Sequence, residues 1–323
     1  VMVRHSRGQI NLQLPPRRAH TVQLALHDDE RQLYDAIAAL SRRLLVDDKV
    51  TSAHRFGVRT LLHEAGSSAA ATCSTLRSLA DVKALHEYSD DLRTLADQAE
   101  AIQHSAKADA LTKLLEAQAK GGGERSKVVI FTQFRATQDM LAEHLTQTGV
   151  DFALYHGGLT IAQKDQAIRD FADHLPVLLS TEAAGEGRNL QFCRALVNFD
   201  LPWNPQRIEQ RVGRIHRIGQ DQPVDIFNLA AQGTIEEYVL DILDRKLNMF
   251  ELVIGEMDMI LGQLADERDF EDIVTEIWQQ AADDDTLAAN MTALGDQLVE
   301  ARRTYQQAKE YDDALFGEDF STE

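Results

Sequence analysis

Four arginines recur at spacings of three and four residues in one stretch of the chain: Arg207, Arg211, Arg214 and Arg217. Such spacing places side chains on one face of a helix, where four guanidinium groups repel each other unless they meet negative charge. Carboxylates or a phosphate chain would supply that charge, because the planar guanidinium matches both. The plainer interpretation is a solvated helix with salt bridges, which the flanking glycines and glutamines make less favourable.

Two further stretches could bind phosphate. Residues 180–190 read STEAAGEGRNL, and their glycines let backbone amides approach a ligand closely, although turns need glycine too. Thr132 and Gln133 follow the apolar run VVIF, and their hydroxyl and amide groups can donate to phosphate oxygens. Taken alone, that pair is more simply a polar turn.

These three stretches lie where strands are expected to end. The alternation of strand and helix patterns predicts right-handed crossovers and a mostly parallel sheet flanked by helices, in which ligands bind beyond the carboxyl ends of the strands. Strands are predicted over 127–134, 151–157, 176–181, 195–200 and 224–230. Helices are predicted over 136–148, from the capping box of Thr160 and Gln163 to about Phe171, and from Pro205 through the arginines.

The flanking segments are mostly helical in pattern. TVQLAL alternates like a strand, and residues 52–118 have helical periodicity that breaks at the small residues Gly66-Ser67-Ser68. Gly121-Gly122-Gly123 is the clearest break, expected to be a linker or a tight loop. We predict a linker and helical insertion over 1–104, an α/β lobe over 105–240 and an acidic helical extension over 241–323. Two sets of leucines and their neighbours are predicted to face inward: Leu33, Ile37, Leu40 and Leu44 on one helix, and Leu76, Leu79, Val82 and Leu85 on another.

Composition narrows the classes of protein. The chain has 323 residues, 44% hydrophobic and 26% charged, which is typical of a globular protein. No apolar run approaches the ~20 residues that span a bilayer, and two cysteines do not make a disulfide scaffold. A net charge of -19 argues against binding to nucleic acid. However, residues 231–323 hold 24 acidic and 6 basic residues and therefore carry nearly all of that negative charge. A solvated surface is the simplest role for that acidic segment; a partner-binding segment and a DNA mimic are the alternatives.

The motifs, in order, resemble the second RecA-like lobe of a superfamily 2 helicase-like ATPase of the Swi2/Snf2 type. VVIFTQF resembles motif IV, LYHGG its continuation, LLSTEAAGEGRNLQ motif V and QRVGRIHRIGQ motif VI. With PPRRAHTVQLALHDDERQLYDAI upstream, the likeness covers about two thirds of the chain. Arg188-Asn189 together with FDLPWNP is nearest the bacterial RapA-like branch.

This resemblance implies a RecA-like parallel sheet flanked by helices, with further mostly helical segments at both ends. Arg214 and Arg217 would be arginine fingers that stabilise charge on the transferred phosphoryl group, and Gln210, Gly187 and Asn189 would help bind the nucleotide. The phosphates of a nucleic acid would be bound by six residues: Thr132, Gln133, His156, Gly157, Ser180 and Thr181.

The implied cofactor is ATP with Mg²⁺, held mainly by a preceding lobe. A phosphate loop of the form G-x-x-x-x-G-K-[ST] does not occur in these 323 residues, and the glycine-rich run from Gly121 to Lys127 lacks the required ending. We therefore predict that this chain alone hydrolyses ATP negligibly. No metal site is predicted, because the histidines and cysteines lack metal-ligand spacing. The resemblance gives Arg211 no settled role.

The leading hypothesis is the C-terminal half of a DNA-dependent ATPase that translocates on duplex DNA by closing and opening two lobes. The alternatives are a non-catalytic nucleic-acid-binding or regulatory lobe, and a motor subunit of a bacterial restriction-like anti-phage defence system. The expected partners are the N-terminal RecA-like lobe, double-stranded DNA and a protein bound through the acidic extension, with no membrane. The expected location is the bacterial cytoplasm, at the nucleoid.

Overall fold

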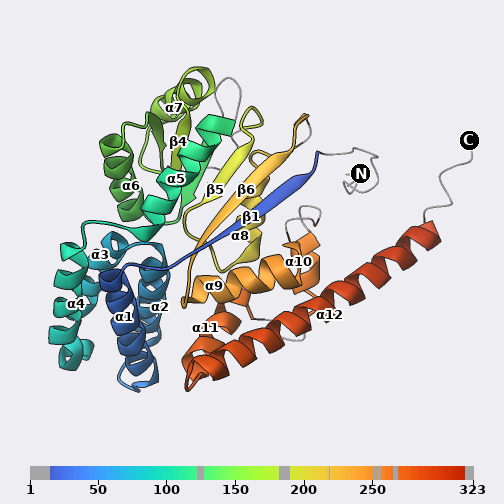
Figure 1. Ribbon diagram of the computed structural model, residues 1–323. Helices are drawn as coiled ribbons and strands as arrows, with labels where there is room; N and C mark the ends of the chain where they lie inside the picture. The colour runs from blue at the N-terminus through green and yellow to red at the C-terminus, as the bar shows by residue number, and fades with distance from the viewer. Residues whose placement is uncertain are drawn as a thin grey trace, which may run out of the picture.

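A six-stranded parallel sheet forms the centre of the molecule (Figure 1). This computed structural model describes residues 15–121, 127–181, 190–217, 219–249, 252, 256–264 and 268–316. The strands lie in the order β1-β6-β5-β2-β4-β3, and every pairing among them is parallel. Their bounds are β1 Arg17–Leu24, β2 Val128–Thr132, β3 Phe152–Tyr155, β4 Val177–Thr181, β5 Ala195–Asn198 and β6 Val224–Ala231.

The order of the strands creates a switch point next to β2. From β2 the chain runs to the edge strand β3, returns to β4, and then crosses to the other side of β2 to form β5 and β6. The connections that leave β2 and β5 run in opposite directions, and ligands of open parallel sheets bind beyond the carboxyl ends of two such strands. The structure therefore directs attention to the residues that follow β2 and β5.

Helices cover both faces of the sheet, which explains why the central strands are continuously apolar. Val128 and Ile130 of β2 pack in one cluster with α5 (Ala106–Gly121) and α6 (Arg135–Gln147). Val129 and Phe131 pack on the opposite face, in the cluster that holds α7 (Ile161–Asp173) and α8 (Pro205–Val212). The predicted capping box of α7 is confirmed: the Thr160 side chain accepts from the Gln163 amide, and the Gln163 side chain accepts from the Thr160 amide.

The N-terminal helices pack against the lobe. They are α1 (Asp28–Val46), α2 (Ser52–Ser67), α3 (Ala69–Ala80), the 3₁₀ helix η2 (Lys83–Tyr88) and α4 (Ser89–Ala101). All four residues predicted to face inward on α1 are buried. The prediction that Leu76, Leu79, Val82 and Leu85 lie on one helix was wrong. Helix α3 ends at Ala80, and the amide of Val82 closes a turn onto the Leu79 carbonyl. Leu85 is nevertheless buried, from η2.

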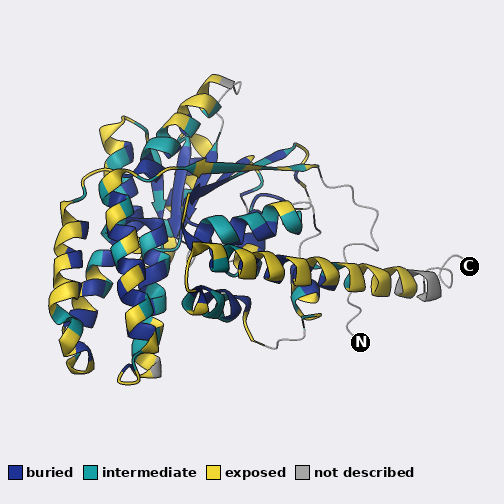
Figure 2. Cartoon of the chain, turned by 60° about the horizontal axis from the view of Figure 1, so that its bottom comes forward, coloured by how far each residue is buried: buried dark blue, intermediate teal, exposed yellow. Residues whose placement is uncertain are grey.

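The C-terminal segment is helical, as predicted, and ends in a helix that reaches beyond the body of the protein (Figure 1). Its elements are α9 (Ile235–Leu240), the π-helix η4 (Asp241–Lys246), α10 (Glu256–Leu261), α11 (Phe270–Gln280) and α12 (Asp284–Phe316). One face of the first half of α12 is buried, from Leu287 through Leu294 to Ala301. The outer turns of this helix are mostly exposed (Figure 2).

Strand β1 lies in the segment predicted as linker and insertion, yet it pairs with β6 along its whole length and forms an edge of the sheet.

In the part of the chain that the structure describes, no helix has the length and apolar character needed to cross a membrane.

Candidate functional site

Parallel pairing brings the predicted phosphate-binding residues together at the carboxyl edge of β2, β4 and β3. Thr132 lies opposite Thr181, and Tyr155 lies opposite Ser180. His156 and Gly157 follow β3 directly, and Gln133 follows β2. All six residues that the sequence singled out for nucleic-acid phosphates therefore lie on one edge of the sheet.

Burial divides these six residues into two groups. Thr132, Ser180 and Thr181 are buried, and the Ser180 hydroxyl donates to the Thr181 carbonyl at 3.1 Å. Gln133 and His156 are half-buried and Gly157 is exposed. The side chains or backbone of the second group are accessible to a ligand in this conformation. The first group lies below the protein surface and is not.

His156 is placed to act as a neutral group. Its Nδ1 accepts a hydrogen bond from the Gly158 amide at 3.2 Å. Burial and then the nearby Arg135 lower the pKa of the imidazole from its ordinary value. The lowered pKa favours the neutral imidazole, whose Nδ1 is already occupied by the Gly158 amide.

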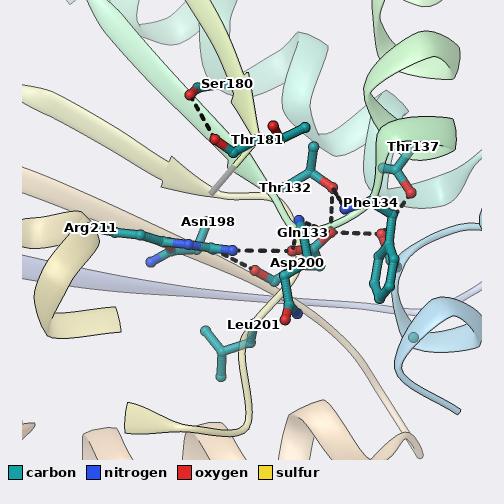
Figure 3. Close-up of polar contacts among 12 residues, drawn as sticks. Thr132, Gln133, Phe134, Thr137, Ser180, Thr181, Asn198, Asp200, Leu201 and Arg211 are labelled. Atoms are coloured by element: carbon teal, nitrogen blue, oxygen red, sulfur yellow. Dashed lines mark hydrogen bonds and ion pairs between the residues drawn. The ribbon is translucent and has the colours of Figure 1, made fainter. Parts of the chain in front are cut away.

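Asp200, just beyond β5, joins this edge to the neighbouring segments (Figure 3). It is fully buried, and its carboxylate accepts a hydrogen bond from the Thr132 hydroxyl. The amide of Gln133 donates to both carboxylate oxygens, at 2.9 and 3.2 Å. Ser67, from the α2–α3 junction, donates its hydroxyl to Oδ2 at 2.7 Å. Such bonds satisfy the oxygens of the buried carboxylate and fix the loop that leaves β2.

Arg211 forms the remaining side of this cluster (Figure 3). Its guanidinium lies 3.4 Å from Asp200 Oδ1 in a buried ion pair. It also donates to the Asp200 carbonyl at 2.8 Å and to Asn198 Oδ1 at 2.9 Å. The Asn198 amide in turn donates to Asn228 at 2.7 Å, which connects β5 to β6. A buried charge with these partners fixes α8 against the sheet.

The prediction that four arginines share one helical face was wrong. α8 begins at Pro205, with the Asn204 side chain accepting from the Gln206 amide at 2.9 Å, and ends at Val212 before Gly213. Within α8, Arg207 is exposed and Arg211 points into the core. Arg211 falls three residues after the buried Ile208, so helical geometry turns it toward the sheet.

Arg214 and Arg217 follow α8 in a turn and a bend. Arg214 is half-buried, and its carbonyl accepts from the Leu190 amide at 3.1 Å, which ties this segment to the end of the glycine-rich stretch. Arg217 is exposed, as is Gln210 at the end of α8. Neither arginine is enclosed in the protein interior.

Gly187 and Asn189, predicted to bind the nucleotide, lie outside the described residues, as does Arg188. The three placed candidates, Gln210, Arg214 and Arg217, offer amide and guanidinium donors. These donors suit phosphate oxygens. Mg²⁺ instead requires oxygen ligands such as carboxylates. These three side chains therefore suit some of the phosphate oxygens of a triphosphate, whereas a Mg²⁺ ion would need oxygen ligands from other residues.

Sequence reasoning missed the centre of the site. Asp200 closes the run ALVNFD, but its significance depends on β5 lying beside β2, which only the order of strands in space reveals. The sequence predicts a helix break at Ser67 and gives that residue no other role. Two further side chains pack in the interior: Trp203 stacks on His63 with ring centroids 3.7 Å apart, and Cys193 is fully buried.

Comparison with known proteins agrees with this arrangement. Residues 106–219 match the helicase conserved C-terminal domain. An uncharacterised ATP-dependent helicase of Bacillus subtilis, YqhH, is 36% identical over 299 residues, which are 91% of this chain and 51% of YqhH. The RNA polymerase-associated protein RapA of Vibrio vulnificus is 34% identical over 149 residues, 45% of this chain and 15% of RapA.

Solved structures share the fold. The C-terminal part of the Fun30 ATPase domain superposes with a TM-score of 0.53 at 20% identity, over 82% of this chain and 98% of that one. The Sulfolobus solfataricus SWI2/SNF2 ATPase core in complex with double-stranded DNA gives 0.52 at 23% identity, over 83% of this chain and 48% of that one. The protein contains a RecA-like C-terminal lobe of a superfamily 2 helicase. The fold is that of the SWI2/SNF2 ATPase core, in agreement with the Swi2/Snf2 motifs that the sequence resembles. The chain spans about half the length of YqhH.

Proposed function

We propose that this chain is the C-terminal half of a DNA-dependent ATPase that translocates on double-stranded DNA. The observation that carries the proposal is the cluster at Asp200. It joins the edge predicted to bind nucleic acid to the helix that precedes the predicted arginine fingers, through Gln133 on one side and Arg211 on the other. The similarity to YqhH, named an ATP-dependent helicase, and to an ATPase core crystallised with double-stranded DNA supports the same activity.

In this proposal the chain contributes cations to a reaction centred on the preceding lobe. ATP supplies the phosphoryl group that is transferred to water. Arg214 and Arg217 stabilise the charge that develops on the transferred group's oxygens, and Gln210 positions the phosphate chain. Arg211 holds the helix from which these residues extend, because its own charge is paired inside the protein.

The nucleic-acid side of the lobe would hold phosphates without reading sequence. Gln133, His156 and Gly157 reach the ligand from the edge of the sheet, and contacts of this kind position a strand but carry no base specificity. Closing of the two lobes around ATP would then move this edge relative to the DNA. The proposed location is the bacterial cytoplasm, at the nucleoid.

Arg217→Ala in the full-length protein tests the finger assignment. We expect ATP turnover to fall by about 10³–10⁵-fold, because the substitution removes charge stabilisation needed only in the transition state. Fluorescence anisotropy should find an unchanged affinity for duplex DNA. Arg303→Ala, on the exposed part of α12, is the matched control and should leave both quantities unchanged. Undiminished turnover in Arg217→Ala would remove the assignment.

A companion measurement distinguishes a motor from a regulatory lobe. The 323-residue chain alone should hydrolyse ATP negligibly with or without DNA, while the full-length protein should be stimulated by duplex DNA. A full-length protein that binds DNA but shows no turnover would instead be a non-catalytic nucleic-acid-binding protein.

A further inference from the structure

The α2–α3 junction reaches into the carboxyl edge of the sheet. Its small residues Ser67 and Ser68 are only 2% and 5% exposed, although both helices belong to the N-terminal helical segment. Small side chains at a helix junction are ordinarily explained by the turn itself. Here they also make hydrogen bonds to residues more than sixty positions away in the sequence.

The two serines hold two different elements of the lobe. The Ser67 hydroxyl donates to Asp200 Oδ2 at 2.7 Å and lies 2.8 Å from the hydroxyl of Thr137. The Ser68 hydroxyl lies 2.7 Å from the same Thr137 oxygen and accepts from the Ala71 amide, which caps α3. Thr137 is fully buried in the first turn of α6, directly after the loop that leaves β2.

Asp200 thus receives hydrogen bonds from three separate segments. One is the α2–α3 junction through Ser67, the second is the loop after β2 through Thr132 and Gln133, and the third is α8 through Arg211. A carboxylate with two oxygens cannot move toward one of these donors without lengthening its bonds to the others. Displacement of any one segment must therefore displace the others or break a buried bond.

We infer that Ser67 and Ser68 are positioning residues through which the α1–α4 helices control the coupling between DNA binding and ATP hydrolysis. This inference rests on the function proposed above. DNA phosphates would move the loop at Gln133, the Gln133 amide would carry that movement to Asp200, and Arg211 would carry it to α8 and the arginines that follow. Ser67 fixes the resting position of the carboxylate against the helical segment, and Ser68 does so indirectly through Thr137.

The test uses Ser67→Ala in the full-length protein, with Ser78→Ala as the matched control. Ser78 is an exposed serine on α3 whose hydroxyl bonds only locally, to the Ser74 carbonyl. A shift of about 1 Å at an active site costs about 10²-fold in rate, so we expect Ser67→Ala to lower DNA-stimulated turnover by about tenfold or more. The KM for ATP and the Kd for duplex DNA should stay within about twofold, because no ligand contact is removed.

Two further measurements separate positioning from simple destabilisation. Ser67→Cys, which keeps the size and a weak donor, should restore part of the stimulation. Hydrogen exchange in the full-length Ser67→Ala protein should be faster for the peptides that cover Gln133 and α8, and unchanged for β6. The Ser78→Ala protein should match the wild type in every measurement.

The outcomes are distinct. Normal stimulation in a folded Ser67→Ala protein would overturn the inference and leave the proposed function intact. A loss of stimulation accompanied by an equal loss of DNA affinity or of folded protein would also overturn it, because the serine would then be merely structural. A wild-type protein whose turnover does not respond to DNA would overturn the proposed function and the inference together.

Discussion

Two buried ion pairs lie close together in this protein, and both contact the α2–α3 junction and the segment after β5, yet they differ in what else they hold. Lys107 pairs with Glu236, donates to the Gly66 carbonyl at 2.7 Å, and leaves Glu236 to accept from the Leu201 amide at 3.1 Å. Asp200 pairs with Arg211. It also accepts hydrogen bonds from Ser67, which follows Gly66, and from Gln133, which follows β2. The first pair connects α5 and α9, which are scaffold helices; the second connects a predicted ligand-binding loop to α8.

Burial alone does not identify a functional carboxylate in this protein. Both ion pairs are almost completely enclosed, and burial raises the pKa of Glu236 to about 7. A perturbed pKa can mark a catalytic group, but the Glu236 carboxylate is enclosed in the interior, where the Lys107 ammonium group and the Leu201 amide hold it. Asp200 is the functional candidate because of where its donors lead: to Gln133, which reaches the edge of the sheet, and to Arg211.

Removal of one partner from either pair should cause the largest loss of stability. Arg211→Ala would leave Asp200 without its cation, and Lys107→Ala would do the same to Glu236. Each should lower the free energy of unfolding by about 3–5 kcal/mol, because the remaining carboxyl must either stay charged without its cation or take up a proton in the interior. Urea denaturation of the two variants checks the comparison. A loss below about 1 kcal/mol in either would show that water reaches that pair.

A smaller effect is expected at Glu64, on α2 one turn before the junction. Its Oε1 accepts from Thr75 at 2.9 Å, its Oε2 finds no hydrogen-bond partner among the described residues, and burial raises the pKa of the carboxyl from 4.5 to about 7. The folded pKa exceeds the unfolded one, so the contribution of Glu64 is fully present below about pH 4.5 and is lost as the pH rises through 7.

Glu64→Gln should therefore remove this pH dependence. At about pH 8 the variant should be more stable than the wild type by at most about 3 kcal/mol, and at about pH 4 the two should be nearly equal. Chemical denaturation across this range measures the difference. An identical pH profile in both proteins would show that Glu64 ionises as an ordinary surface carboxylate.

The strand pattern was predictable because burial on both faces selects continuous apolar runs such as VVIF and VLL, and the turns between them carry recognisable caps. The ends of helices were not predictable where helical spacing continues beyond the last helical residue. The run from Arg207 to Arg217 has helical spacing throughout, but Gly213 follows the last helical residue and the arginines divide into exposed, buried and non-helical positions. Spacing alone cannot detect an ending that depends on packing against the sheet.

The site was predictable as a set of loops but not as a cluster. The residues at the carboxyl ends of β2, β3 and β4 could be placed on one edge, because all strands of a parallel sheet end on the same side. The roles of Asp200 and Ser67 could not, because both depend on contacts between segments 133 positions apart. The resemblance to Swi2/Snf2 proteins also left Arg211 unexplained, and only its ion pair gives that residue a role.

The most direct test of this account replaces each ion pair by an uncharged pair of similar size in the full-length protein. One variant carries Asp200→Asn with Arg211→Met, and the other carries Lys107→Met with Glu236→Gln. Neutral replacement leaves no buried charge unpaired, so both variants should fold. The measurement is the ratio of DNA-stimulated to basal ATP turnover. We predict a ratio within about twofold of the wild type for the Lys107–Glu236 variant and a loss of about tenfold or more for the Asp200–Arg211 variant. Equal ratios in two folded variants would contradict the account.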